Sequence, residues 1–161
     1  MRPLPVLRVL ICALAVLSLG ARPARALEAI VFLSSGSPGD VWGAGVGASL
    51  SSSLFHVVML DAELARQGYD TAEGKLLSFS VAACLAPSIG HFTPYAGFGV
   101  GLRRQTLGDS SDNGTLSSLL AGIKFRIGLL MLRAEYRTFS VSGSPLVPLE
   151  HRIYAGAGIS F

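Results

Sequence analysis

Apolar and polar residues alternate with a period of two through most of the chain beyond residue 26. The alternation is clearest at 95–102, where apolar residues interleave with Tyr95 and three glycines, and it recurs at 119–126, 130–138 and 152–161. A period of two is typical of strands with one apolar face and one face of polar or small residues. No comparable stretch keeps the 3.6-residue period of an amphipathic helix. The pattern predicts an all-β protein.

The alternation divides the chain into eight predicted strands. They span 27–34, 41–51, 56–67, 75–86, 93–105, 114–126, 130–141 and 150–161. Their mean length of about 12 residues is near the ~9–11 that a tilted strand needs to cross a bilayer. The connections tend to alternate between long and short, as in outer-membrane barrels, which have long outer loops and short periplasmic turns. With the N-terminus on the periplasmic side, the outward loops are 35–40, 68–74, 106–113 and 142–149.

One face of the predicted strands carries the charges and most of the glycines. Its charged residues are Asp61, Glu63, Arg103, Lys124, Arg126, Arg133, Glu135, Arg137, Glu150 and Arg152, and its glycines include Gly43, Gly45, Gly47, Gly97, Gly99, Gly101, Gly122, Gly156 and Gly158. Glycine is useful where space is short, and the interior of an eight-stranded barrel is narrow. This face is therefore predicted to line the lumen, and the opposite face of Leu, Ile, Val, Phe and Ala to contact lipid.

The luminal charges are the one polar constellation in the sequence. Because isolated charges in a narrow interior are costly, they are predicted to pair in a structural network that fills the barrel. A gated ion path through breakable pairs is the alternative. A porin is excluded, because eight strands leave no standing aqueous channel.

The N-terminus has the layout of a secretory signal peptide. Arg2 and Arg8 precede an apolar segment at 9–19, and Ala24 and Ala26 form an A-x-A cleavage signal. Two domains are predicted: a signal peptide, 1–26, and a β-barrel, 27–161. The leader contains four of the 13 basic residues and no acid, so the mature chain has nine basic residues against ten acidic ones, a net charge of −1. Nucleic-acid binding is therefore not predicted.

Composition narrows the class further. Half of the residues are hydrophobic, 14% are charged and the mean hydropathy is +0.54, which excludes intrinsic disorder. The longest apolar run, 9–17, is shorter than the ~20 residues of a spanning helix. After the leader a single cysteine remains, Cys84, which excludes an intrachain disulfide and is predicted to be buried. No metal-ligand cluster, phosphate loop or nucleotide fingerprint is found, so no cofactor is predicted.

Four segments resemble the small outer-membrane β-barrel family typified by the OmpA barrel and OmpX. They are TPYAGFGVGLR at 93–103, LLAGIKFRIG at 119–128, LRAEYRTF at 132–139 and YAGAGISF at 154–161. The last is the most specific: Phe161, preceded by Ile153, Ala155, Ala157 and Ile159 in alternation, is similar to the C-terminal signal that the bacterial barrel-assembly machinery recognises. The resemblance implies an eight-stranded antiparallel up-and-down transmembrane β-barrel in the outer membrane of a Gram-negative bacterium.

Two other functions are alternatives to a structural or surface-interaction role. A lipid A-modifying enzyme would need a histidine beside a serine nucleophile on the outer surface. Of the three histidines, His56, His91 and His151, only His91 has a hydroxyl two residues on, Thr93, and it falls in a predicted periplasmic turn. A secreted soluble barrel that binds an apolar ligand is the other alternative. The favoured prediction is a monomeric outer-membrane barrel with a structural or surface-interaction role, whose partners are membrane lipid and the assembly machinery and whose loop ligand is not specified.

Overall fold

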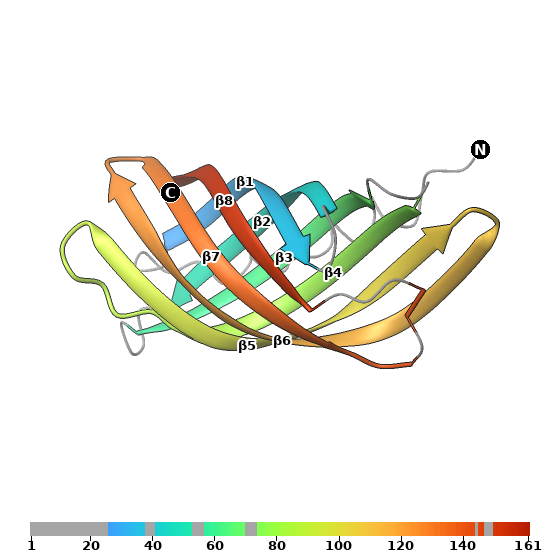
Figure 1. Cartoon of the computed structure of the whole chain (residues 1–161). Coiled ribbons are helices and arrows are strands. Elements are labelled where there is room, and N and C mark those ends of the chain that lie inside the picture. Colours follow the sequence, from blue (N-terminus) through green and yellow to red (C-terminus); the bar gives the residue numbers. More distant parts are fainter. Residues whose placement is uncertain (1–25, 38–40, 53–56, 70–73, 144, 147–149) are drawn as a thin grey trace.

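The computed structural model describes residues 26–37, 41–52, 57–69, 74–143, 145–146 and 150–161. These residues form eight strands (Figure 1). The strands are β1 (Ala26–Ser37), β2 (Val41–Ser52), β3 (Val58–Tyr69), β4 (Gly74–Leu85), β5 (Phe92–Leu107), β6 (Ser110–Ile127), β7 (Leu130–Val141) and β8 (His151–Ser160). No helix within these residues is long and apolar enough to cross a membrane. Of the predicted leader, only Ala26 is described, and it starts β1.

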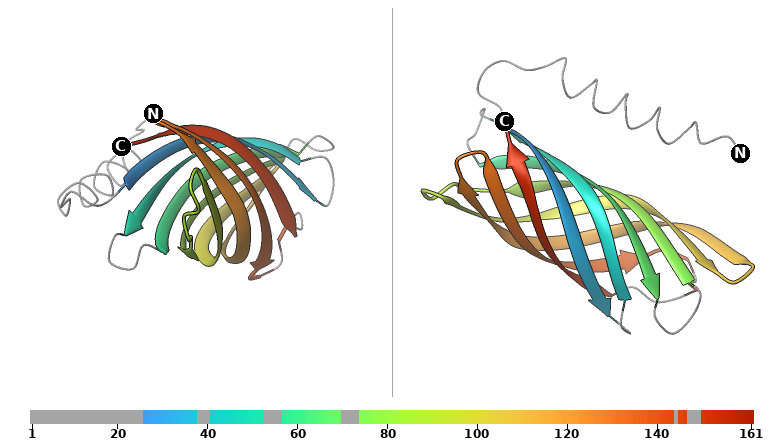
Figure 2. Two further views of the ribbon diagram at one scale, coloured as in Figure 1. Left: turned by 90° about the vertical axis from the view of Figure 1, so that its left-hand side faces the viewer. Right: turned by 90° about the horizontal axis from the view of Figure 1, so that it is seen from above.

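The strands form a closed antiparallel barrel in chain order, which confirms the predicted fold class. Each strand pairs with the next one, and β8 pairs with β1 from Glu28↔Ser160 to Ser37↔His151. Closure leaves no strand edge unpaired. Figure 2 shows the strands wrapping obliquely around the barrel. The start of β1 and the end of β8 lie at one end, and the β5–β6 hairpin projects from the other, at the right of Figure 1.

Buried and exposed residues alternate along the strands as the sequence pattern predicts. In β4 every second residue is buried, from Leu76 at 0% exposure to Cys84 at 3%, whereas Phe79 is 42% exposed. The predicted outward residues Phe98, Val100, Ile123, Leu132 and Ile159 are 43–55% exposed, and Phe125 is half-buried beside Phe92. The predicted luminal residues Lys124, Arg133 and Glu135 are at most 8% exposed. The interior of this barrel is charged and its outer wall is apolar.

Glycines on the luminal face occupy places where a side chain does not fit. A Cβ on Gly156 would lie 2.7 Å from the backbone oxygen of Val31, and a Cβ on Gly99 would lie 2.8 Å from the Ser118 hydroxyl. Such distances are shorter than ordinary van der Waals contacts. The glycines therefore let the barrel wall close around the large luminal side chains. This lack of space is the reason for which the glycine-bearing face was predicted to line the lumen.

The predicted loop at 106–113 is wrong. β5 continues to Leu107 and β6 begins at Ser110, so that only Gly108 and Asp109 form the turn, with Gly108 at a φ of 56°. β6 and β7 are also joined by two residues, so the predicted alternation of long and short connections does not hold. Serine, aspartate and asparagine indicate a turn in the sequence. A hairpin that extends beyond the apolar band, however, carries polar residues on both faces while its backbone ladder continues.

Candidate functional site: the luminal charge network

Arg133 and Asp61 form the centre of the luminal network. The Arg133 guanidinium on β7 donates to both carboxylate oxygens of Asp61 on β3, each at 2.8 Å. The same side chain donates from Nε to the Tyr95 hydroxyl at 2.7 Å and from Nη2 to Glu135. Tyr95 in turn donates to Glu135 at 2.8 Å. The fork of the guanidinium thus connects three strands through charge-assisted hydrogen bonds, the strong class in proteins.

Arg137 extends this centre toward the end of the barrel opposite the start of β1 and the end of β8. Its Nε donates to Glu135 at 2.8 Å, its Nη2 lies 3.1 Å from Glu63, and its Nη1 donates to the Ser80 hydroxyl at 3.0 Å. Glu63 also accepts a 2.9 Å bond from the hydroxyl of Tyr154, whose ring lies 5.3 Å from the Arg137 guanidinium. With both arginines engaged by carboxylates, the centre holds three acids and two cations, all at most 8% exposed.

A separate group lies nearer the end of the barrel that holds the termini. Glu28 on β1 is 1% exposed and accepts from Lys124, and also from Arg126 at 2.7 Å. The Lys124 ammonium also contacts the Met59 sulfur. These contacts join β1 to β6 across the interior, over 96 residues of sequence.

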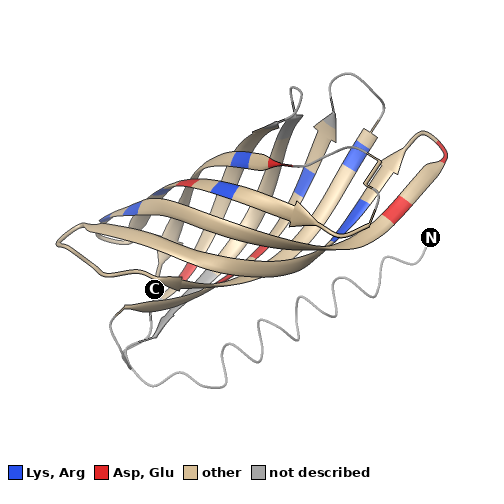
Figure 3. Ribbon diagram, turned by 60° about the horizontal axis from the view of Figure 1, so that its bottom comes forward, with Lys and Arg blue, Asp and Glu red and all other residues tan. Residues whose placement is uncertain are grey.

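Arg103 and Arg152 lie nearer the end of the lumen opposite the start of β1 and the end of β8. Arg103 lies 2.7 Å from Asp112 and donates to Gln105 at 2.9 Å. The Arg152 guanidinium is flanked by rings, 4.3 Å from the centre of Phe139 and 5.2 Å from that of Tyr154. Its Nε and Nη1 make no hydrogen bond within the described part of the chain. Figure 3 shows the acidic and basic positions spread over several strands of the wall.

The centre of the network is filled. The void that Asp61, Glu63, Arg133, Glu135 and Tyr154 line has a volume of about 10 Å³. A single water needs about 10–15 Å³. This void therefore has room for about one water molecule.

Solved structures with the same architecture include small outer-membrane β-barrels. Neisserial surface protein A is 18% identical, with a TM-score of 0.58, over 84% of this chain and 94% of its own. The N-terminal β-barrel domain of Pseudomonas aeruginosa OprF is 20% identical, with a TM-score of 0.55, over 84% and 97%. This chain has the fold of the small outer-membrane β-barrels. Yersinia pestis Ail, in phospholipid nanodiscs, is 14% identical with a TM-score of 0.54 over 84% and 99%.

These likenesses establish the fold and no more. No protein-family model matches the sequence, and the search of curated proteins found no match. The outer membrane enzyme PagL has the same fold, with 15% identity and a TM-score of 0.54 over 83% of this chain and 98% of its own. The fold therefore does not separate enzymes from proteins without catalysis, and the side chains have to be considered individually.

The two described histidines of this barrel lie next to aromatic rings. His91 lies 6.3 Å from the ring of Phe125, and His151 lies 6.0 Å from that of Tyr136. Thr93 shares a hydrogen bond with Ser88 at 3.2 Å. Within the described residues, neither histidine side chain has a hydrogen bond to a serine or threonine, and no group of three His, Cys, Asp or Glu could hold a metal ion. His56 lies outside the described residues.

Two predicted members of the network are placed differently from the rest. Glu150 is exposed and precedes β8, and its backbone oxygen accepts a hydrogen bond from the Phe139 N–H at 2.8 Å. Its assignment to the lumen is wrong, because β8 begins one residue later than predicted and alternation has no meaning outside a strand. Arg126 is half-buried: its side chain is 43% exposed at the end of the barrel while it reaches Glu28.

Glu135 does not pair with the two cations of the neighbouring strand β6, Lys124 and Arg126. The register places Gly122 opposite Glu135, and it places Lys124 opposite Arg133, a cation. Both cations of β6 contact Glu28 instead. In a narrow barrel, long side chains reach the opposite wall, so the partner is chosen across the lumen rather than along the neighbouring strand.

Sequence reasoning missed Glu28, Tyr95 and Tyr154 as members of the network. Tyr95 and Tyr154 are both 3% exposed and donate to buried carboxylates. The alternation places both tyrosines on the charged face of their strands. Because a buried tyrosine hydroxyl needs a hydrogen-bond partner, this position could have identified them as members of the network. Glu28 lies in the first predicted strand, where the alternation is weakest.

Proposed function

We propose that this chain is a monomeric integral outer-membrane protein of a Gram-negative bacterium, exported with a leader that is cleaved after Ala26. Its closed lumen serves to stabilise the barrel, and its role is structural or one of surface interaction through the residues at the end opposite the termini. The single observation that carries the proposal is the inverted polarity of the barrel, with buried charges inside and an apolar wall outside.

Burial and exposure support this environment for the barrel. Arg137 and Arg152 are at most 1% exposed, while the outward Leu119 and Ile153 are above 60%. In water, a continuous apolar wall of this kind would favour association, and the charged face would point to solvent. In a bilayer the same wall is solvated by acyl chains, and closure satisfies every strand edge. The outer-membrane barrels of the same fold support the same location.

Membrane fractionation with gel mobility tests the location. We expect the full chain expressed in a Gram-negative host to be recovered in the outer-membrane fraction. Its migration should differ between unheated and boiled samples, because a closed barrel resists detergent until it is heated. N-terminal sequencing of the exported protein should begin at Leu27. Recovery as a soluble periplasmic protein whose mobility does not depend on heating would overturn the proposal.

Deleting Phe161 tests the proposed interaction with the barrel-assembly machinery. Phe161 is 68% exposed, and its N–H donates to the Leu27 backbone oxygen at 2.8 Å, beside the point where β1 and β8 close. Because the leader is untouched, we expect the truncated chain to reach the periplasm, fail to insert and be degraded. Quantitative immunoblots of membrane and periplasmic fractions measure this effect. The matched control is Phe161→Trp, which keeps the terminal aromatic ring and should insert normally; equal membrane levels of the truncated and full chains would contradict the prediction.

A further inference from the structure

Three cations point outward from the apolar wall, and they occupy one patch. Arg66 on β3, Lys75 on β4 and Arg104 on β5 are all exposed. Arg66 and Arg104 are the register partners of Leu77 on its two sides, and Lys75 lies two residues from Leu77 on the same face of β4. The other lysines and arginines of the described residues belong to the luminal network. We call Arg66, Lys75 and Arg104 the basic patch.

The basic patch has no acidic partner within the described strands. Among the described residues, none forms an ion pair or hydrogen bond with these three side chains. The acids on β3 and β7, together with Glu28, point into the lumen. Asp70 and Glu73, between β3 and β4, lie outside the described residues. The patch therefore concentrates three positive charges at the edge of the apolar wall.

The position of the patch along the strands corresponds to a membrane boundary. Lys75 is the second residue of β4, and Arg66 and Arg104 each lie three residues before the end of their strands. All three are near the end opposite the termini. A charge on the lipid face is costly at the centre of a bilayer and nearly neutral at its interface. In the proposed orientation, this end is at the headgroups of the outer leaflet.

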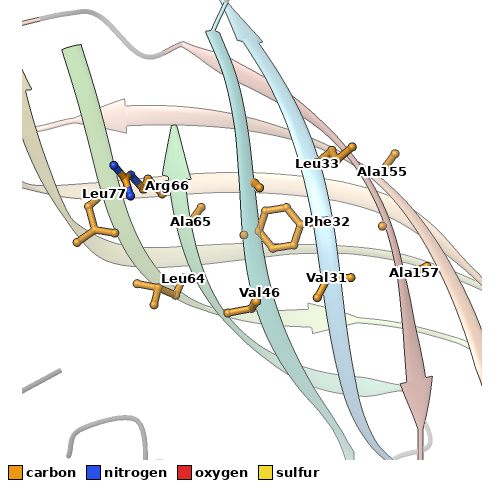
Figure 4. Close-up of a pocket in the computed structure, with 13 residues that line it drawn as sticks. Val31, Phe32, Leu33, Val46, Leu64, Ala65, Arg66, Leu77, Ala155 and Ala157 are labelled. Carbon is orange, nitrogen blue, oxygen red and sulfur yellow. The ribbon is translucent and has the colours of Figure 1, made fainter. Parts of the chain in front are cut away.

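An apolar groove adjoins the patch on the same outer wall. It has a volume of about 800 Å³ and crosses β8, β1, β2, β3 and β4. Its lining combines the small side chains of Ala44, Ala155 and Ala157 with the larger ones of Val31, Val46 and Leu64. Figure 4 shows Arg66 and Leu77 next to each other at one edge of the groove, with Ala155 and Ala157 at the other.

We propose that the patch and the groove together bind a phosphorylated, multiply acylated glycolipid of the outer leaflet, the chemistry of lipid A. The inference rests on the proposed outer-membrane location. Adjacent strands are about 4.8 Å apart, so the Cα atoms of Arg66 and Arg104 are separated by roughly 10 Å. Long side chains from that spacing can converge on one phosphate, and guanidinium groups bind phosphate through paired hydrogen bonds. The groove then holds an acyl chain beside the headgroup.

The unpaired charge favours this occupant over other membrane lipids. Three cations that have no acidic partner within the described residues favour a headgroup with more than one negative charge, whereas a zwitterionic phospholipid would leave most of the charge uncompensated. The width of the groove, across five strands, suits a lipid with several acyl chains. The residues of the patch and the groove come from β1 to β5 and β8, and these segments meet only on the barrel wall.

Binding to defined lipids tests the proposal. The full chain is reconstituted in phosphatidylcholine nanodiscs, and the binding of fluorescent diphosphorylated lipid A is compared with that of its dephosphorylated form. We expect the diphosphorylated lipid to bind at least ~10-fold more tightly, a difference that small changes in headgroup contacts produce. The triple variant Arg66→Gln, Lys75→Gln, Arg104→Gln should lose this preference, and the charge-conserving variant Arg66→Lys, Lys75→Arg, Arg104→Lys should keep most of it.

Additional measurements distinguish a lipid site from a site for free phosphate and from a loss of fold. Excess inorganic phosphate should not displace the lipid; displacement would show a free-phosphate site and overturn the proposal. Ala155→Phe, which fills the groove, should weaken binding of the acylated lipid while the preference for phosphate remains. Heat-dependent mobility verifies the fold of each variant, and the comparison of the two lipids on the unmodified chain needs no variant. A chain that inserts into the outer membrane and binds both lipids equally would refute this inference alone, whereas a chain that does not insert refutes the proposed function.

Discussion

Replacing Glu135 with alanine is expected to lower the free energy of unfolding by about 3–5 kcal/mol, the cost of breaking a buried ion pair from one side. Glu135 is 4% exposed and accepts hydrogen bonds from Tyr95, Arg133 and Arg137. Its removal leaves the Tyr95 hydroxyl and the Arg137 Nε without their acceptor in a dry interior. Arg133 keeps its two bonds to Asp61, which limits the loss. Denaturant unfolding of the barrel in detergent micelles measures the effect.

Two variants serve as controls for Glu135→Ala. Glu150→Ala removes an exposed acid outside the network and should change the stability by no more than ~0–1 kcal/mol, the range of surface charges. Glu135→Gln keeps acceptor capacity at the same place and should cost less than the alanine variant. Equal stability of Glu135→Ala and Glu150→Ala would mean that the network does not stabilise the barrel. Planar-bilayer conductance should stay negligible in each variant; a steady conductance of a folded Glu135→Ala barrel would indicate the gated ion path instead.

Replacing Ile123 with arginine is expected to cost about 2–4 kcal/mol, the penalty for a charge on the lipid face near the midplane. Ile123 is 43% exposed and is the middle one of the outward positions 119, 121, 123, 125 and 127 of β6. An arginine there would have acyl chains on all sides and no acid on the same face of its strand. Reversible unfolding in phospholipid vesicles measures the loss.

Leu129→Arg provides the matched control for this position. Leu129 is 71% exposed in the turn between β6 and β7, so its arginine reaches the interface and should cost ~0–1 kcal/mol. The difference between the two arginine variants reports the position of the bilayer on the barrel. If Ile123→Arg were as stable as Leu129→Arg, or more soluble without loss of stability, the outer wall would be in water and the membrane proposal would be wrong.

The sequence determined the strands and the direction in which each side chain points. Alternation is a local property of a strand, because successive Cβ atoms point to opposite faces, so a few residues suffice to assign Phe98 outward and Arg133 inward. The glycines then decided which face was inside, since a charged face with so little bulk fits only a narrow lumen. The number of strands followed from the same pattern, and the antiparallel up-and-down order from the resemblance to the small outer-membrane barrels. The predicted strand boundaries were reliable where the alternation of apolar residues stops at the end of the strand. They failed at 106–113, where the backbone pairing of β5 and β6 continues although the apolar residues have ended.

Only the tertiary structure decided which of these side chains meet. Lys124 and Arg126 pair with Glu28 on β1, and Arg133 pairs with Asp61 on β3, because closure of the barrel brings distant strands to face each other across the lumen. Register and closure are properties of the whole sheet, and no local period encodes them. For the same reason the basic patch could not be read from the chain: Arg66, Lys75 and Arg104 become neighbours only through the pairing of β3, β4 and β5 around Leu77.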